Sequence, residues 1–218
     1  MHCAVEFVEV HRRPQVRGLS FAAPAQGVTA VTGGASGLQT LVFRMICGLD
    51  VPDGGAVIVL GRDMSRAGKR DRRQIQRRMG VVFGGQELGL FAGASARENV
   101  AIAVRTAGRS GRGRERAMID GGLQALDISH LADLVPADLT ARQRKRLALA
   151  RALAQRAPLL VADAFDDGCD GDEAAALAEV VAEECRRRGT AAVLALRDAG
   201  LAARVAEHVV DLSVLVGH

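Results

Sequence analysis

One glycine-rich stretch has the residue types and the spacing to bind phosphate. It reads VTGGASGLQT and covers residues 31–40. A phosphate-binding loop has the pattern G-x-x-x-x-G-K-[ST] between a strand and a helix, because backbone N–H groups and the helix N-terminus surround the phosphates. Gly33, Gly37 and Thr40 fit such a loop. The Thr40 hydroxyl could also serve as an oxygen ligand of Mg²⁺.

Two positions of this loop depart from the pattern. Leu38 stands where the pattern has glycine, and Gln39 stands where it has lysine. A charge-assisted hydrogen bond is worth roughly 1.5 to 3 kcal/mol, so the neutral amide predicts phosphate binding weaker by about one to two decades. The Leu38 side chain is expected to crowd the loop or to oppose a positive φ. The alternative is a glycine-rich turn that never bound phosphate.

Length and composition favour one α/β domain with a modest insertion. The chain has 218 residues, of which 49% are hydrophobic, and a formal net charge of +4. This charge is too small to indicate nucleic acid, and the absence of Trp and Tyr leaves little for base stacking. Basic residues cluster at 66–78, which we interpret as a solvated helix face, with an acidic partner as the alternative.

The sequence gives no sign of a membrane span or of export. No apolar run reaches the 18 or so residues that cross a bilayer, and the N-terminus lacks the order of a signal peptide. Cys3, Cys47, Cys169 and Cys185 are scattered without metal-ligand spacing, so we expect reduced, mostly buried thiols. These features predict a cytosolic protein.

Short apolar runs alternate with helical patterns along much of the chain, and this alternation predicts a mostly parallel sheet covered on both faces. Residues 87–139 show helical segments and no convincing strand, so they are expected to form a helical insertion in a single domain whose core is about 1–86 and 140–218. The expected strands are 5–10, 27–32, 56–60, 80–83, 159–163, 191–196 and 208–212, and the clearest helices are 41–47, 142–155 and 173–187.

Three longer stretches, in order, resemble the nucleotide-binding subunit of an ATP-binding-cassette (ABC) transporter. LQTLVFRMICGLDVPDGGAVIVLGRDM is similar to the family's helix after the phosphate loop and the segment that follows. MGVVFGGQELGLFAGASARENVAIAV resembles the glutamine-loop region, and LADLVPADLTARQRKRLALARALAQRAPLLVADAFDD resembles the signature motif, its helix and the Walker B strand. The resemblance implies a P-loop cassette fold with an N-terminal antiparallel β part.

The resemblance assigns roles to the signature motif, which is usually L-S-G-G-Q. Here it stands as Leu139, Thr140, Ala141, Arg142 and Gln143. In the family the serine and the glycine backbone reach the γ-phosphate of ATP bound by a partner cassette. Thr140 keeps a hydroxyl, whereas Arg142 adds bulk at this close approach or offers its guanidinium to the phosphate instead.

Two further positions that the family uses for hydrolysis are changed. Walker B ends in Asp-Glu, where the aspartate holds Mg²⁺ through water and the glutamate polarises the attacking water. Asp163 is present, but Ala164 follows it, and Asp166 and Asp167 come after the expected strand. Arg197 replaces the switch histidine. No catalytic residue is therefore assigned.

The glutamine loop and the adenine site also depart from the family. Counting from GVVF places the loop glutamine at Gly84, whereas counting back from RENV places it at Gln86, which the match QELGLF favours. Pro14 occupies the place of the aromatic residue that stacks on adenine, with Arg12 and Arg13 as weak substitutes. The dimer-interface aspartate is kept as Asp170.

Together these matches give a set of positions for ATP and Mg²⁺, with binding expected to be weakened or lost. The nucleotide positions are Gly33, Gly34, Ala35, Ser36, Gly37, Leu38, Gln39, Thr40, Gln86, Thr140, Arg142, Gln143 and Asp163. The Mg²⁺ positions are Thr40, Gln86 and Asp163.

Three functional hypotheses follow from the resemblance. The first is a degenerate cassette subunit on the inner face of the cell membrane that docks to a permease, dimerises and hydrolyses ATP poorly or not at all. Because two copies would leave both sites without lysine and base, an intact second cassette is the preferred partner. The second is an active transporter ATPase with compensating residues, and the third is a non-catalytic scaffold or regulator. GVTAV and QELGLF resemble importers whereas GLDVPDGG resembles exporters, so the direction of transport stays open.

Overall fold

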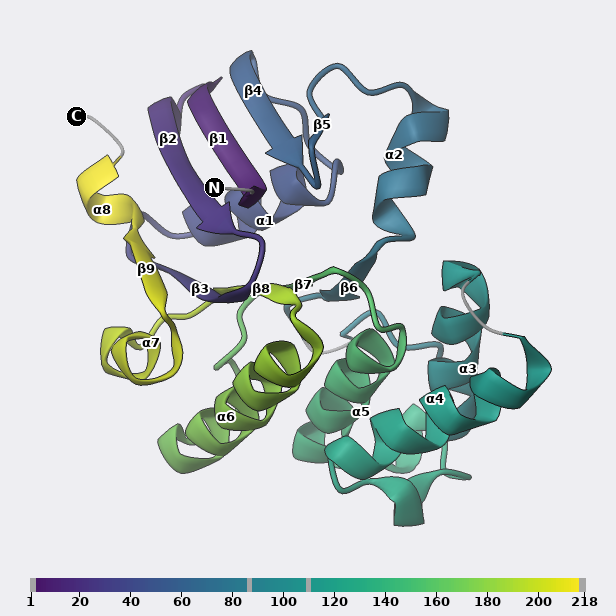
Figure 1. Cartoon of the computed structure of the whole chain (residues 1–218). Helices are drawn as coiled ribbons and strands as arrows, with labels where there is room; N and C mark the ends of the chain where they lie inside the picture. The colour runs from purple at the N-terminus through teal and green to yellow at the C-terminus, as the bar shows by residue number, and fades with distance from the viewer. Residues whose placement is uncertain (1–2, 86–87, 109–110, 216–218) are drawn as a thin grey trace.

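Two β-sheets form the framework of the chain, and helices pack between and beside them (Figure 1). The computed structural model describes residues 3–85, 88–108 and 111–215. The antiparallel sheet has the order β2 (Val16–Pro24), β1 (Cys3–Arg12), β4 (Gly54–Val59) and β5 (Arg62–Asp63). The parallel sheet has the order β6 (Met79–Val82), β7 (Leu159–Ala162), β8 (Ala191–Ala195), β3 (Gly27–Thr32) and β9 (His208–Asp211).

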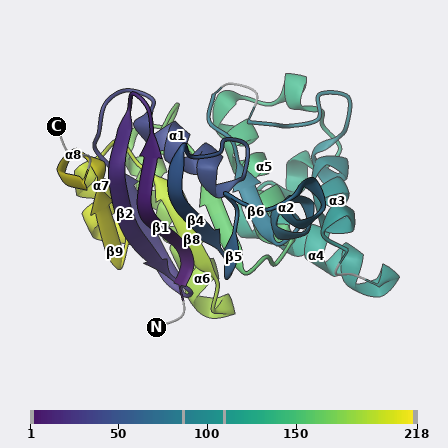
Figure 2. The same ribbon diagram turned by 90° about the horizontal axis from the view of Figure 1, so that it is seen from above.

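The helices divide between the two faces and one side of the parallel sheet. Helix α1 lies between the two sheets, α5 and α6 cover the opposite face, and α2, α3 and α4 lie to one side (Figures 1 and 2). The α-helices are α1 (Leu38–Ile46), α2 (Lys69–Gln76), α3 (Ala96–Ala107), α4 (Arg112–Ala125), α5 (Ala141–Ala154), α6 (Gly171–Arg188), α7 (Ala199–Val205) and α8 (Leu212–Leu215), and the 3₁₀ helices are η1 (Ser129–Leu131) and η2 (Pro136–Asp138).

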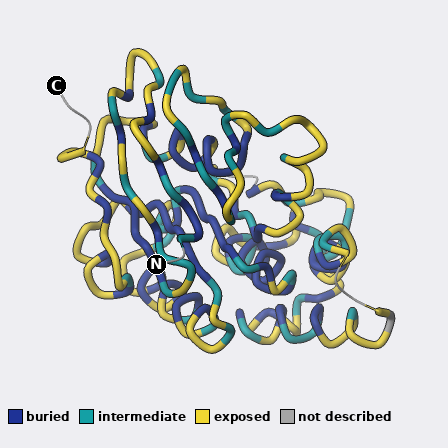
Figure 3. The backbone as a smooth tube through the Cα atoms, turned by 45° about the horizontal axis from the view of Figure 1, so that its top comes forward, coloured by how far each residue is buried: buried dark blue, intermediate teal, exposed yellow. Residues whose placement is uncertain are grey.

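The sequences of the central strands explain their position. Every residue of β7 and β8 is buried, because helices and the second sheet cover both faces, as is usual for parallel strands (Figure 3). Val161 pairs with Val193, and Val193 pairs with Thr29, so the three strands are in register. Their carboxyl ends therefore lie at one edge of the sheet, where α/β proteins commonly bind ligands.

Two hydrophobic clusters hold these layers together. One contains α1, the antiparallel sheet and the facing side chains of the parallel sheet, including Phe7, Met45 and Ile46. The other joins the opposite face of the sheet to helices α3 to α6 and includes Leu147 and Leu177. The second cluster runs without a break from the sheet into α3 and α4, so these helices share the main core.

The α/β class, the mostly parallel sheet and the antiparallel N-terminal sheet are confirmed. All seven expected strands are present, whereas β2 and β5 were not expected from the apolar pattern. Irregularities in the pairing of β1 with β2 break the simple alternation of buried and exposed side chains in these strands. Within the described part of residues 87–139 there are helices and no strand, as expected.

Candidate functional site

The glycine-rich loop joins β3 to α1 at the carboxyl edge of the parallel sheet. Gly33, Gly34 and Gly37 have φ of 67°, 82° and 82°, which is the left-handed region that glycine adopts readily. A Cβ on Gly33 would lie 2.2 Å from Asp211 Oδ1, so this position requires glycine for space as well. The loop residues Gly34, Ala35, Ser36 and Gly37 are exposed. Since the first N–H groups of an α-helix have no intrahelical acceptor, α1 directs them toward this loop.

Gln39 is tied to the backbone on both sides of the site. Its Nε2 donates to the carbonyl of Gly33 at 3.2 Å and to the carbonyl of Leu196 at 3.2 Å. These two hydrogen bonds use both amide hydrogens. The lysine position of the motif therefore holds a neutral group that links the loop to the end of β8 and has no donor left for phosphate.

Leu38 does not take the positive φ of the loop, so the expectation that it opposes such a φ is wrong. Leu38 is the first residue of α1 and is 3% exposed. The positive φ falls on Gly37 instead, where the loop turns into the helix. The Leu38 side chain packs under the loop, near Gly34 and within the cluster that also contains Leu212. The Leu38 side chain is therefore part of the core.

Thr40 and Asp163 form the oxygen pair expected for Mg²⁺. Thr40 Oγ1 donates to the Asp163 carboxylate, at 3.2 Å from Oδ1 and 3.1 Å from Oδ2. Asp163 is 6% exposed, and this burial raises its pKa, while the hydrogen bond from Thr40 opposes the shift. A hydroxyl and a carboxylate are suitable ligands for Mg²⁺. These two residues thus fit the metal, and the loop fits the phosphates except at Gln39.

Ala164 and Lys145 occupy the place where a catalytic base is expected. Ala164 has φ of 44°, and its carbonyl accepts a hydrogen bond from Lys145 Nζ at 2.9 Å. Lys145 lies on α5 and is 3% exposed, and its burial lowers its pKa. The ammonium also lies over the Phe165 ring, 5.7 Å from the centroid. The buried Lys145 ammonium therefore binds the backbone of Walker B at Ala164, the position that directly follows Asp163 and carries no carboxylate.

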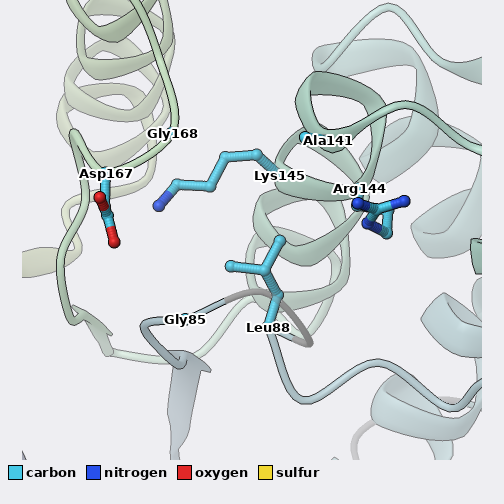
Figure 4. Close-up of a pocket in the computed structure, with 7 residues that line it drawn as sticks. All are labelled: Gly85, Leu88, Ala141, Arg144, Lys145, Asp167 and Gly168. Atoms are coloured by element: carbon cyan, nitrogen blue, oxygen red, sulfur yellow. The ribbon is translucent and has the colours of Figure 1, made fainter.

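Sequence reasoning missed Lys145, although a signal for it was present. Leu149 and Ala152, four and seven residues further on, are core residues of the same helix. This spacing places Lys145 on the buried face of α5. Its side chain reaches a cavity of about 440 Å³ that Gly85, Leu88 and Asp167 also line. Figure 4 shows its amino group directed toward Asp167 across this cavity.

Two aspartates that follow Walker B, Asp166 and Asp167, bind the backbone and side chain at Arg197, the switch position. The backbone N–H groups of Arg197 and Asp198 both donate to Asp166 Oδ2 at 2.9 Å. The Arg197 guanidinium pairs with Asp167 Oδ1 at 3.2 Å. The other oxygen of Asp166 is buried and has no hydrogen-bond partner among the described residues. Acidic groups are thus present here, but they are committed to the segment after β8.

The signature residues cap α5 and pair with α6. Thr140 and Gln143 form a reciprocal capping box, with 3.2 Å from the Gln143 N–H to Thr140 Oγ1 and 2.8 Å from the Thr140 N–H to Gln143 Oε1. Arg142 makes an ion pair with Asp170 and another with Glu173, the latter at 2.9 Å. The Arg142 guanidinium is therefore engaged within its own chain rather than free for phosphate. No hydrogen bond between described residues joins the signature motif to the glycine-rich loop.

The glutamine-loop and adenine positions predicted from the sequence are only partly found at the site. Gln86 lies outside the described residues, whereas Gly84 lies against Asp163, because a Cβ there would be 3.0 Å from Asp163 Oδ2. Arg12 is paired with Asp53 at 2.8 Å, and this carboxylate also accepts the Arg13 N–H at 2.8 Å. A further contact that the sequence did not reveal joins the Gly34 N–H to Ser213 Oγ at 2.8 Å.

Comparison with known families identifies the class of protein that this fold and site define. The model of the ABC transporter family matches residues 16–165. The chain therefore belongs to the ABC transporter family.

Individual relatives agree with this assignment. The lipoprotein-releasing system ATP-binding protein LolD 2 of Caulobacter vibrioides is 35% identical over 91% of this chain and 86% of its own length. The methionine import ATP-binding protein MetN of Bradyrhizobium diazoefficiens is 30% identical over 93% of this chain and 57% of its own length. The chain thus spans little more than half of the methionine import relatives that it matches.

Solved structures confirm the fold. The post-hydrolysis dimer of the ATP-binding cassette MJ0796, bound to ADP and Pi, has a TM-score of 0.81 at 19% identity and covers 94% of this chain and 92% of its own. CbiO1 of Clostridium perfringens, part of the transporter complex cbiONQ, has a TM-score of 0.84 at 20% identity, with 96% and 84% covered. Among the described residues no helix is long and apolar enough to cross a membrane.

Proposed function

We propose that the chain is a nucleotide-binding subunit of a membrane transporter that binds ATP and Mg²⁺ weakly and hydrolyses ATP poorly or not at all. The observation that carries this proposal is the neutral, doubly hydrogen-bonded Gln39 amide at the lysine position. What remains of the site supports residual binding, because the loop is exposed and Thr40 still faces Asp163. Bound Mg²⁺ would neutralise charge on the phosphate oxygens.

The region after Walker B supports the loss of hydrolysis. Ala164 has no group that can accept a proton from water, and Lys145 holds its carbonyl. Of the two acids that follow Ala164, Asp166 receives two backbone N–H groups on one oxygen and buries the other, and Asp167 pairs with Arg197. A general base needs a free carboxylate within hydrogen-bond reach of the water. We infer that this chain supplies none.

The test is to measure ATP binding by the purified chain and then turnover, alone and with a candidate partner cassette. Binding in the high micromolar range or weaker, with no turnover by the isolated chain, is the expected result. Asp163→Ala serves as the control, because it should remove the Mg²⁺ dependence of binding. Robust turnover by the isolated chain would refute the proposal. Absence of any nucleotide binding would refute it too, in favour of a scaffold.

A surface groove supports docking to a transmembrane permease. It has a volume of about 590 Å³ and lies between the helical part of about 87–139, which we propose as an insertion, and the sheet edge at β6. Exposed apolar side chains and three arginines, Arg73, Arg77 and Arg151, line it, which suits an amphipathic helix. The lining includes Leu49, Phe83, Phe91, Met79, Arg73 and Arg77. Such docking would place the chain in the cytoplasm, on the inner face of the cell membrane.

Co-purification with the permease encoded beside this chain's gene tests the docking surface. Phe91 is 50% exposed and its backbone is held by buried Asn99, which accepts the Phe91 N–H at 2.8 Å. Phe91→Asp should abolish co-purification without unfolding the chain. Leu215→Asp, at a 36% exposed leucine of α8, is the matched control and should keep it. Equal loss in both variants, or none in Phe91→Asp, would contradict the proposed surface.

The second cassette is proposed to be an intact, different chain. The relative MJ0796 is described as a dimer, and two copies of the present chain would place Ala164 and Gln39 in both composite sites. An intact partner would bring a complete loop and base to one of them. Mixing the chain with such a cassette and ATP should give a heterodimer in size-exclusion chromatography, and a homodimer under the same conditions would contradict this choice.

A compensated ATPase is the second candidate, since two cations, Lys145 and Arg197, act electrostatically on Asp163. A scaffold or regulator is the third. It is favoured by the exposed basic side chains of α2, among them Lys69, Arg70 and Arg73. The same binding and turnover measurements separate all three.

A further inference from the structure

The basic charge of the chain is concentrated in one short segment. Residues 62–78 include eight basic and two acidic residues, a net charge of +6, whereas the whole chain carries +4. The rest of the chain is therefore slightly acidic. The segment contains β5 and α2, and α2 lies at the outside of the molecule, between β5 and α3 in the view of Figure 1.

The cations of α2 lie on the face of the helix that points away from the core. Ile75 is the buried residue of this helix. The arginines at 70, 73 and 77 are spaced three and four residues apart, so they share one face, opposite Ile75. These arginines and the neighbouring Lys69 are all exposed. Helix α2 and its C-terminal cap thus present a row of cations to their surroundings.

This row of cations is not neutralised within the chain. Over residues 3–85, 88–108 and 111–215, no ion pair or side-chain hydrogen bond engages Lys69, Arg70, Arg73 or Arg77. By contrast, the exposed Arg44 of α1 pairs with Asp50 at 2.6 Å. The positive charge of α2 is therefore available to a partner outside the chain.

The charge pattern does not stabilise α2 itself. Like charges three or four residues apart on a helix repel each other, and cations in the first turn oppose the helix dipole. Lys69 and Arg70 stand in that first turn, and Gly68 at the N-cap supplies no side-chain hydrogen bond. The same pattern becomes favourable next to a negatively charged surface, because such a surface removes the repulsion.

The proposed docking groove sets the direction in which these cations face. Arg73 and Arg77 line that groove together with Leu49 and Phe91, so the row continues from the groove onto the open face of α2. A permease seated in the groove is embedded in a bilayer, and α2 would then stand beside the cytoplasmic leaflet. That leaflet is negatively charged and attracts basic segments within a Debye length. Nucleic acid suits the face less well, because a chain without Trp and Tyr has little for base stacking.

We propose that Lys69, Arg70, Arg73 and Arg77 form a surface that binds the anionic lipid headgroups of the leaflet beside the permease. The inference rests on the proposed docking groove for its orientation and does not depend on nucleotide binding. It gives the chain a second, electrostatic attachment to the membrane. Each cation near such a surface changes the binding constant about fivefold, so the four act together as individually weak contacts.

Co-sedimentation of the full chain with lipid vesicles, without the permease, tests this surface. Vesicles with about 30 mol% phosphatidylglycerol in phosphatidylcholine should bind the chain, pure phosphatidylcholine vesicles should not, and raising the salt from about 0.05 to 0.5 M should release it. Lys69→Gln/Arg70→Gln should weaken binding about tenfold or more, since it removes two of the cations. Because neither residue lines the groove, co-purification with the permease in detergent should be unchanged.

Arg17→Gln/Arg204→Gln is the matched control. It removes the same charge from exposed positions on β2 and α7, which lie on the other side of the molecule from α2 (Figure 1). The control should keep its vesicle binding. Equal weakening in the two double variants would attribute the effect to net charge and overturn the inference, as would equal binding of the unaltered chain to both kinds of vesicle.

Other outcomes separate this inference from its alternatives and from the docking groove. If inorganic phosphate releases the chain from vesicles at an ionic strength at which chloride does not, the cations form a discrete phosphate site and the inference fails. Tighter binding to single-stranded RNA than to the anionic vesicles would overturn it too. If the permease fails to co-purify while vesicles bind the chain through Lys69 and Arg70, the groove is refuted and the lipid surface stands. Docking without vesicle binding refutes the lipid surface alone.

Discussion

The Thr40 hydroxyl donates to both oxygens of the buried Asp163 carboxylate, at 3.2 and 3.1 Å. The two residues are 123 positions apart in the sequence, and the alignment of β3 with β7 through β8 brings them together. The pair is present in a chain that carries Gln39 at the lysine position and Ala164 directly after Asp163. It is the part of the proposed metal site that the fold brings together.

Asp163→Asn is expected to stabilise the chain at neutral pH while weakening Mg²⁺-dependent nucleotide binding. Burial raises the folded-state pKa of Asp163 above its ordinary value of 3.8, so the folded chain holds this proton more tightly than the unfolded chain. Above the folded pKa the ionised carboxylate destabilises the fold, and this cost fades as pH falls through that pKa toward 3.8. Asparagine removes the charge at every pH.

Thermal unfolding measured from pH 7.5 to pH 4 checks this prediction. The melting temperature of the variant should exceed that of the unaltered chain at neutral pH, and the difference should shrink as the pH falls. Asp133→Asn, at an exposed aspartate, is the control and should not change the melting temperature at neutral pH. A lower neutral-pH melting temperature in Asp163→Asn would show that the carboxylate stabilises the fold.

Gln39→Lys alone should tighten ATP binding. The lysine ammonium would add a charged hydrogen bond worth roughly 1.5 to 3 kcal/mol, which corresponds to about a tenfold to hundredfold change in the dissociation constant. Gln76→Lys is the matched control, because the Gln76 amide also donates to a backbone carbonyl, that of Cys47 at 2.9 Å, away from the loop. It should leave the affinity unchanged. Turnover should stay absent in Gln39→Lys, because Ala164 still provides no base.

Equal affinity in Gln39→Lys and the unaltered chain, measured by nucleotide titration, would mean that the missing lysine is not the reason for weak binding. A gain in both lysine variants would attribute the effect to net charge rather than to the loop.

Much of the fold is predictable because its signals are local. The buried strands β7 and β8 are short apolar runs, and helices follow them with clear spacing. Strand β2 is not predictable in this way, since its pairing with β1 contains irregularities that break the alternation. The same distinction applies to the site. The positions of the loop and of Asp163 can be predicted from motif spacing, whereas the role of Lys145 cannot, because it depends on a contact with Ala164, 19 residues away.

Leu38 shows how a motif can mislead. The pattern assigns glycine to its position, but the chain places the required positive φ on Gly37, at 82°, and starts α1 at Leu38. A consensus position describes the loop of the family, whereas the helix start depends on which residues of this chain can be buried. Position 38 therefore belongs to the core, and its side chain can be tested as a core residue.

Leu38→Ala should destabilise the chain by about 2 to 5 kcal/mol, the usual cost of truncating a buried leucine. Urea unfolding gives the free energy of unfolding directly. Leu215→Ala is the control with the same residue change at a 36% exposed site, and it should cost much less. If Leu38→Ala instead kept the stability and improved ATP binding, the side chain would be crowding the loop after all.

Arg142 and Glu173 should show an energetic coupling in a double-mutant cycle. Their side chains form an ion pair at 2.9 Å, and Glu173 is only 7% exposed at its side chain, so removal of Arg142 leaves a poorly solvated carboxylate. Interacting pairs of this kind couple by about 0.5 to 3 kcal/mol. The cycle compares the free energies of unfolding of Arg142→Ala, Glu173→Ala and the double variant in urea.

Arg204 and Glu179 supply the matched cycle, because they are 61% and 65% exposed in an ion pair at 3.0 Å and should couple by less than about 0.5 kcal/mol. A coupling at Arg142 no larger than in this control would mean that the signature arginine is held weakly and is free to reach a phosphate. A larger coupling explains why restoring the family glycine by Arg142→Gly should lower stability. The change would remove the nearer of the two arginines that pair with the buried Glu173, leaving Arg146 at 3.8 Å, at the same time as it opens the signature motif.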